Sequence, residues 1–129
     1  MITANLYAGV FHGAPDQIGQ VRGAVREYLN GCPRSDDVVL IVSEFATNAI
    51  RHSHSRGQFL IVRAEVFRHY VWVGVQDLGG PWHPRQRDGR PHGLDILAAL
   101  VGDNWRTEVT SDGYRITWAR VDFGEASDG

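Results

Sequence analysis

Residues 35–52 constrain the fold most. Apolar residues recur there with helical spacing and cover most of the circumference of the predicted helix. Ser35 is predicted to cap this helix, and Asp36 and Asp37 put negative charge in the first turn, where the helix dipole favours it. The apolar positions are Val38, Val39, Ile41, Val42, Phe45, Ala46, Ala49 and Ile50. A helix with so little polar surface is expected to be largely buried.

One polar stripe interrupts this apolar surface. Glu44, Asn48 and Arg51 follow at i, i+4 and i+7, so they lie on one side of the helix, with His52 beside them. Buried polar groups must be paired, so the stripe is either a satisfied structural set, with Glu44 paired to Arg51, or the floor of a ligand site. In a ligand site, Asn48 offers the hard oxygen that Mg²⁺ accepts, and Glu44 can orient or deprotonate a nucleophile.

The remaining pattern predicts an N-terminal strand, two strand pairs and two more helices. The expected order is a strand at 2–10, a helix at 16–30 capped by Asp16, the helix at 35–52, strands at 59–66 and 70–76, a loop at 81–92, a helix from Gly93, and strands at 105–110 and 114–123. This order favours an α/β (α+β) two-layer sandwich, with a mixed, mostly antiparallel sheet and helices on one face. One domain is expected over 1–129, with a core at about 10–123 and a tail at 124–129.

Composition excludes several classes of protein. The 129 residues carry a net charge of -2, which does not indicate a strongly basic nucleic-acid binder. All 13 basic residues are arginine, so no mechanism can use a lysine. The single cysteine, Cys32, excludes an internal disulfide and fits a reducing compartment. With no membrane-length apolar run and no visible signal peptide, a cytoplasmic location is expected.

Two further segments place polar groups at the ends of elements. Asp77 ends a strand before Gly79 and Gly80, which is either a plain turn or a carboxylate that accepts a hydrogen bond from the amino group of a base. Gly93 opens a helix after the arginine-rich segment 81–92, which is either a phosphate site or a solvated basic loop. Each segment alone is weak evidence, and the order of all three motifs is more specific.

In this order the motifs resemble those of the GHKL (Bergerat-fold) ATP-binding family, and specifically its small bacterial anti-sigma-factor and serine-kinase type. Residues 42–52 are similar to the family's N-box, 75–81 to its first glycine box and 92–97 to its second. The resemblance covers about Ala14 to Val121. It implies an α/β sandwich with helices on one face of a mixed sheet, in agreement with the pattern of elements.

The resemblance also implies a role for each matching residue. Glu44 would be the catalytic carboxylate that activates the attacking hydroxyl. Asn48 would ligate the Mg²⁺ that bridges the phosphates, with Arg51 and His52 in the same box. Asp77 would bind the adenine amino group. The glycine boxes would add Gly79 and Gly80 beside the base, Gly93 and Leu94 at the phosphates, and residues 81–92 as a lid.

One departure from the family pattern bears on activity. The second glycine box usually begins Gly-x-Gly-Leu, and here Pro91 replaces the first glycine, which removes an N–H and fixes φ. Two functions therefore stay open: an ATP-dependent serine/threonine kinase that phosphorylates a small antagonist protein and so controls transcription, or a catalytically weak module that sequesters a sigma factor or other regulator. A structural domain without a ligand is a third. ATP, ADP and Mg²⁺ are the expected ligands, a homodimer is allowed, and no nucleic-acid or membrane partner is expected.

Overall fold

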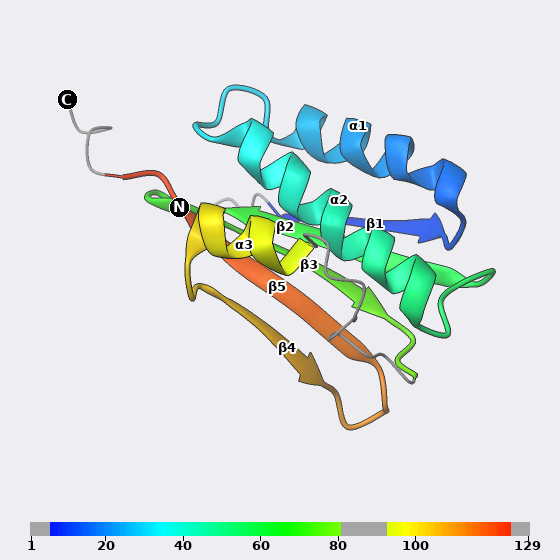
Figure 1. Cartoon of the computed structure of the whole chain (residues 1–129). Helices are drawn as coiled ribbons and strands as arrows, with labels where there is room; N and C mark the ends of the chain where they lie inside the picture. Colours follow the sequence, from blue (N-terminus) through cyan, green and yellow to red (C-terminus); the bar gives the residue numbers. More distant parts are fainter. Residues whose placement is uncertain (1–5, 81–92, 125–129) are drawn as a thin grey trace.

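The computed structural model describes residues 6–80 and 93–124, which form one sheet with helices on one of its faces (Figure 1). Five strands pair in the order β1-β2-β3-β5-β4. They are β1 (Leu6–His12), β2 (Phe59–Val66), β3 (Tyr70–Asp77), β4 (Trp105–Val109) and β5 (Arg115–Asp122). The helices are the 3-10 helix η1 (Pro15–Gln17) and the α-helices α1 (Ile18–Tyr28), α2 (Ser35–His52) and α3 (Gly93–Val101). The predicted α+β sandwich is confirmed, and every described pairing is antiparallel where a mixed, mostly antiparallel sheet was expected.

Helices α1 and α2 lie side by side on one face of the sheet, and α2 packs against both α1 and the strands, which explains its apolar circumference (Figure 1). It packs against Val21 and Val25 of α1 on one side and against alternate strand residues on the other. Those strand residues are Leu60, Val62, Ala64, Val71, Val73, Val75, Ala119 and Val121. The polar stripe, Glu44, Asn48 and Arg51, is the part of the helix that lies outside this core. No helix within residues 6–80 and 93–124 is long and apolar enough to cross a membrane.

Both predicted helix caps are wrong. Asp16 lies inside η1, and α1 begins after Gln17, whose side chain makes no capping hydrogen bond. Ser35 is the first residue of α2, and its N-cap is Arg34 in the left-handed conformation, with φ of 58°. The local capping preference is overridden because long-range hydrogen bonds hold Arg34 in place.

Arg34 ties three elements together through its guanidinium group. Its Nε donates to Asp37 Oδ2 at 2.8 Å, and its terminal nitrogens donate to the carbonyl oxygens of Leu100 at 2.8 Å and Asp122 at 2.9 Å. These bonds join the start of α2 to the ends of α3 and β5. The left-handed conformation costs a non-glycine residue about 1–2 kcal/mol, which the three bonds must exceed.

The opposite face of the sheet carries no helix in the described residues (Figure 1). Trp72 of β3 and Trp118 of β5 stack there with ring centroids 6.2 Å apart. Arg120 lies over the Tyr70 ring, 5.3 Å from its centroid. Strand alternation therefore sends the apolar row toward α2 and leaves the large aromatic side chains on the open face.

Replacing Arg34 with alanine is expected to lower the free energy of unfolding by about 2 kcal/mol, because three charge-assisted hydrogen bonds are lost. Urea denaturation followed by circular dichroism measures the loss. The control is Arg26→Ala, which removes the exposed Arg26–Asp36 ion pair and is expected to cost less than about 1 kcal/mol. Equal losses in the two variants would show that Arg34 does not hold these elements together.

Candidate functional site

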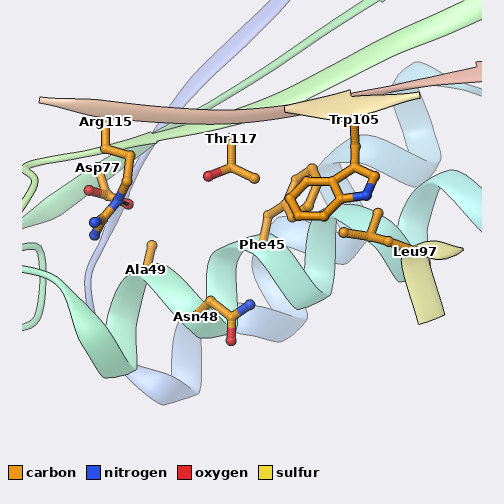
Figure 2. A pocket seen from close by; sticks show the side chains of 8 residues that line it. All are labelled: Phe45, Asn48, Ala49, Asp77, Leu97, Trp105, Arg115 and Thr117. Atoms are coloured by element: carbon orange, nitrogen blue, oxygen red, sulfur yellow. Dashed lines mark hydrogen bonds and ion pairs between the residues drawn. The ribbon is translucent and has the colours of Figure 1, made fainter. Parts of the chain in front are cut away.

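A small cavity of about 20 Å³ lies between α2 and the strands β3, β4 and β5 (Figure 2). Its lining consists of Phe45, Asn48 and Ala49 from α2, Asp77 from β3, Leu97 from α3, Trp105 from β4, and Arg115 and Thr117 from β5. Figure 2 shows Asp77 and Arg115 together at one end, and Phe45, Leu97 and Trp105 at the other. The cavity is therefore charged at one end and apolar at the other.

Asp77 and Arg115 form a buried ion pair across the sheet. They are register partners at the end of β3 and the start of β5. Arg115 Nε donates to Asp77 Oδ2 at 3.3 Å, and the Gly79 N–H donates to Asp77 Oδ1 at 2.7 Å. The Arg115 side chain is 8% exposed and the Asp77 side chain is 6% exposed. Burial raises the pKa of the Asp77 carboxyl above its ordinary value, although the Gly79 N–H and the Arg115 charge both lower it.

The glycine turn after β3 is anchored to the segment that follows α2. The His54 N–H donates to the Gly79 carbonyl at 2.8 Å, and the Leu78 N–H donates at 2.9 Å to Oγ of Ser55, which is completely buried. Gly79 and Gly80 have φ values of 79° and 119°, which other residues rarely adopt. These glycines are thus required by the backbone, which sets the end of β3 relative to α2.

The structure divides the predicted polar stripe between two surfaces. Asn48 is half-buried and lines the cavity, and Glu44 is half-buried one turn earlier on α2. Arg51 is exposed and lines a separate groove of about 330 Å³, formed with Pro15, Ile18, Thr47, Ile50 and Arg56. His52 is half-buried at the last residue of α2. In the described part of the chain no ion pair or hydrogen bond joins Glu44 to Arg51, so the interpretation of the stripe as that pair is wrong.

Helix α3 begins at the predicted phosphate site. Gly93 and Leu94 are its first two residues. Leu97, one turn further along, lines the cavity, so the start of α3 lies about one helical turn from it. The predicted lid at 81–92, which includes Pro91, lies outside the described residues.

The sequence analysis missed the cavity residues that come from β4 and β5. They are Trp105, Arg115 and Thr117. A signal was present, because Arg115 and Thr117 share the helix-facing row of β5 with the buried Ala119 and Val121. A charged side chain in a buried row requires a partner of opposite charge, and Asp77 at the end of β3 supplies it.

The donor set of the cavity suits a nucleotide with Mg²⁺, but its volume does not. The Asp77 carboxylate can accept a hydrogen bond from a base amino group, and the Asn48 amide oxygen is a hard ligand that Mg²⁺ takes alongside phosphates and waters. A volume of about 20 Å³ has room for about one water molecule and is far too small for a purine. Side chains must therefore move before a base can enter.

Comparison with protein families identifies the chain. The histidine kinase-like ATPase domain family matches residues 11–113, a segment that contains every site residue named in the sequence analysis. This chain belongs to the histidine kinase-like ATPase domain family. The predicted family is confirmed, and membership implies that this ATPase domain binds ATP.

A solved structure has the same fold as this ATPase domain. It is the crystal structure of the RsbU and RsbW domains of Rv1364c from Mycobacterium tuberculosis, with a TM-score of 0.69 and 22% sequence identity. The match covers 91% of this chain and 31% of that chain, so the ATPase domain spans less than a third of the matched protein's length. No curated protein matches the chain. At this identity the likeness shows the fold alone.

Replacing Gly79 with alanine is expected to lower the free energy of unfolding by about 3 kcal/mol, because the new Cβ would need a positive φ and would overlap the Gly113 carbonyl oxygen. The control is Gly31→Ala. Its φ is 87° but nothing lies within 4 Å of the added Cβ, so only the conformational cost of about 1 kcal/mol applies. Urea denaturation of both variants compares the two losses. If both variants lose the same free energy of unfolding, the close approach of residue 79 to the Gly113 carbonyl oxygen does not exclude a side chain at that position.

Proposed function

We propose that this ATPase domain is an ATP-dependent serine/threonine protein kinase of the anti-sigma-factor type, which phosphorylates a small antagonist protein and thereby controls transcription. The observation that carries the proposal is that Asn48 and Asp77, which are far apart in sequence, line one cavity in a chain of the histidine kinase-like ATPase family. A fold shared with a structure that contains an RsbW domain supports the regulatory role.

In this proposal the charged end of the cavity recognises the base. The Asp77 carboxylate accepts a hydrogen bond from the exocyclic amino group of adenine. Gly79 and Gly80, which lack side chains, leave the backbone open beside the base. The apolar surfaces of Phe45 and Trp105 would contact the faces of the purine, which are themselves apolar.

The phosphates then lie along α2 and the start of α3. Asn48 would hold Mg²⁺, which neutralises phosphate charge when bound. Gly93 and Leu94 would offer backbone N–H groups from the first turn of α3. Glu44, one helical turn from Asn48, would accept the proton of the attacking serine hydroxyl as the serine oxygen bonds to the γ-phosphorus and ADP leaves. His52 would complete the set at the end of α2, whereas Arg51 lines the separate groove beside η1 and α1.

Phosphoryl transfer suits this set of groups because it depends on positioning and charge neutralisation rather than on a covalent intermediate with the protein. The chain contains no lysine, so phosphate charge must be met by Mg²⁺, backbone N–H groups and arginine. Glu44 is only half-buried, so in this proposal its carboxylate would meet a hydroxyl that arrives from a partner protein. In this proposal these residues would supply a group for each step of transfer to a serine.

Replacing Asn48 with alanine is expected to weaken binding of Mg·ATP about tenfold, because the Mg²⁺ ligand is lost, and to change binding of ATP without Mg²⁺ much less. Calorimetry with and without Mg²⁺ measures both affinities. The matched control is Asn104→Ala, which removes a half-buried asparagine that lines a different groove. No binding of millimolar Mg·ATP by the wild type would contradict the proposed function itself.

Replacing Glu44 with glutamine is expected to reduce phosphoryl transfer by about 10²–10⁴-fold while leaving Mg·ATP affinity within about twofold, because a general base acts on the attacking hydroxyl and not on the nucleotide. Transfer from γ-labelled ATP to serine-bearing candidate partners is the assay. Glu27→Gln, on the exposed face of α1, is the matched control. Undiminished transfer by the Glu44 variant would show that Glu44 is not the general base. Nucleotide and partner binding by the wild type without transfer would favour the module that sequesters a sigma factor.

A further inference from the structure

The carboxylate that the proposed function assigns to the base already has a cationic partner. Arg115 Nε donates to Asp77 Oδ2 at 3.3 Å, and Arg115 Nη1 donates to the Gly80 carbonyl oxygen at 3.5 Å. The guanidinium group therefore occupies the end of the cavity where Asp77 would meet a base (Figure 2). Because the cavity formed by the described residues holds only about 20 Å³, a base that bonds to Asp77 must enter space that the guanidinium group now fills.

The geometry also allows the guanidinium group to leave. The contacts with Asp77 and Gly80 are each longer than the distance of about 2.7–2.9 Å that is typical of charge-assisted N–H···O bonds, so a better-placed donor can replace the guanidinium group at Asp77. Arg115 is the first residue of β5, directly after the exposed turn at 111–114. Its long side chain can turn toward solvent while its backbone keeps the register with β3.

We infer that Arg115 sets the affinity and the base selectivity of the nucleotide site through an exchange of donors at Asp77. The guanidinium group holds the carboxylate in the nucleotide-free protein, and the amino group of the incoming base replaces it. This inference rests on the proposed function, since it requires that a base binds at Asp77. Arg115 and the base are thus competitors for one buried carboxylate.

The exchange has opposite effects on affinity and selectivity. Separating Asp77 from Arg115 costs free energy that every nucleotide must supply, so Arg115 lowers affinity for all of them. A carboxylate that loses its cationic partner in a buried site is strongly destabilised unless another donor takes its place. A base without an amino group leaves the lost donor unreplaced, so Arg115 raises the preference for a base that has one.

The variant Arg115→Thr tests both effects. Threonine suits a β-strand, and its hydroxyl group can donate to Asp77 while leaving room for a base. We expect the Kd for Mg·ATP to fall about tenfold or more, because no ion pair has to be broken. We also expect a smaller preference for Mg·ATP over the Mg²⁺ complex of purine riboside triphosphate, which lacks the amino group. Calorimetry with the two nucleotides gives both values.

Arg120→Thr is the matched control, because it makes the same substitution on the same strand. Arg120 lies on the open face of the sheet, over Tyr70, and outside the cavity. We expect this variant to bind both nucleotides as the wild type does. A general effect of removing an arginine from β5 would appear equally in both variants and would overturn the inference.

The outcomes separate this inference from the proposed function. If the wild type binds Mg·ATP and Arg115→Thr binds it no more tightly, the exchange is wrong and the ATP site stands. If neither protein binds millimolar Mg·ATP, the proposed function fails and the exchange fails with it. A purely structural ion pair would lower the stability of the variant without tightening binding or narrowing the preference between the two nucleotides.

The wild type supplies a second test that does not depend on the variant folding, since breaking a buried ion pair can cost about 3–5 kcal/mol. Phenylglyoxal reacts with accessible guanidinium groups, and mass mapping of peptides reports the residue Arg115 separately. Arg115 is 7% exposed, so its labelling should be slow without nucleotide. Saturating Mg·ATP is expected to raise this labelling severalfold. Unchanged or reduced labelling would show that the guanidinium group stays at Asp77, and would overturn the inference.

Discussion

Burial of α2 on two sides is the constraint on which the rest of the structure depends. Its apolar residues lie against α1 on one side and against the strands on the other, and removing that surface from water stabilises both contacts at once. Polar side chains on α2 are therefore confined to one stripe. Asn48 is the residue of that stripe that lines the cavity, and Glu44 lies one helical turn away. The place of the proposed site is a consequence of how the core is packed.

A buried charge connects the stability of this fold with its proposed activity. Asp77 must be paired inside the protein, and the Gly79 N–H and the Arg115 guanidinium provide that pairing. The same guanidinium group helps to fill the cavity in which a base would lie. Because the ion pair with Arg115 must break before a base can bond to Asp77, the interaction that stabilises the fold lowers the affinity for nucleotide.

Hydrophobic periodicity was enough to predict the helices and both hairpins, because the spacing of apolar residues decides which face of an element is buried. The caps predicted from local residue preferences were wrong. Ser35 has the chemistry of a cap, yet Arg34 is the N-cap, because its guanidinium group reaches carbonyl oxygens at Leu100 and Asp122. Helical spacing likewise predicted that Arg51 shares a site with Asn48. In the structure, η1 and α1 pack beside α2, and Arg51 lines a separate groove with them. Side chains that depend on distant segments were the ones that could not be predicted.

The sequence by itself determined the layers of the fold, the buried helix at 35–52 and the ATPase family, because these follow from local periodicity and from motifs of a few consecutive residues. Only the tertiary structure decided that Asp77 pairs with Arg115 and that this pair leaves too little room for a purine. The physical reason is strand register. Which residue of β5 lies opposite the end of β3 depends on how the two strands pair, and residues 38 positions apart in the chain carry no local signal of it.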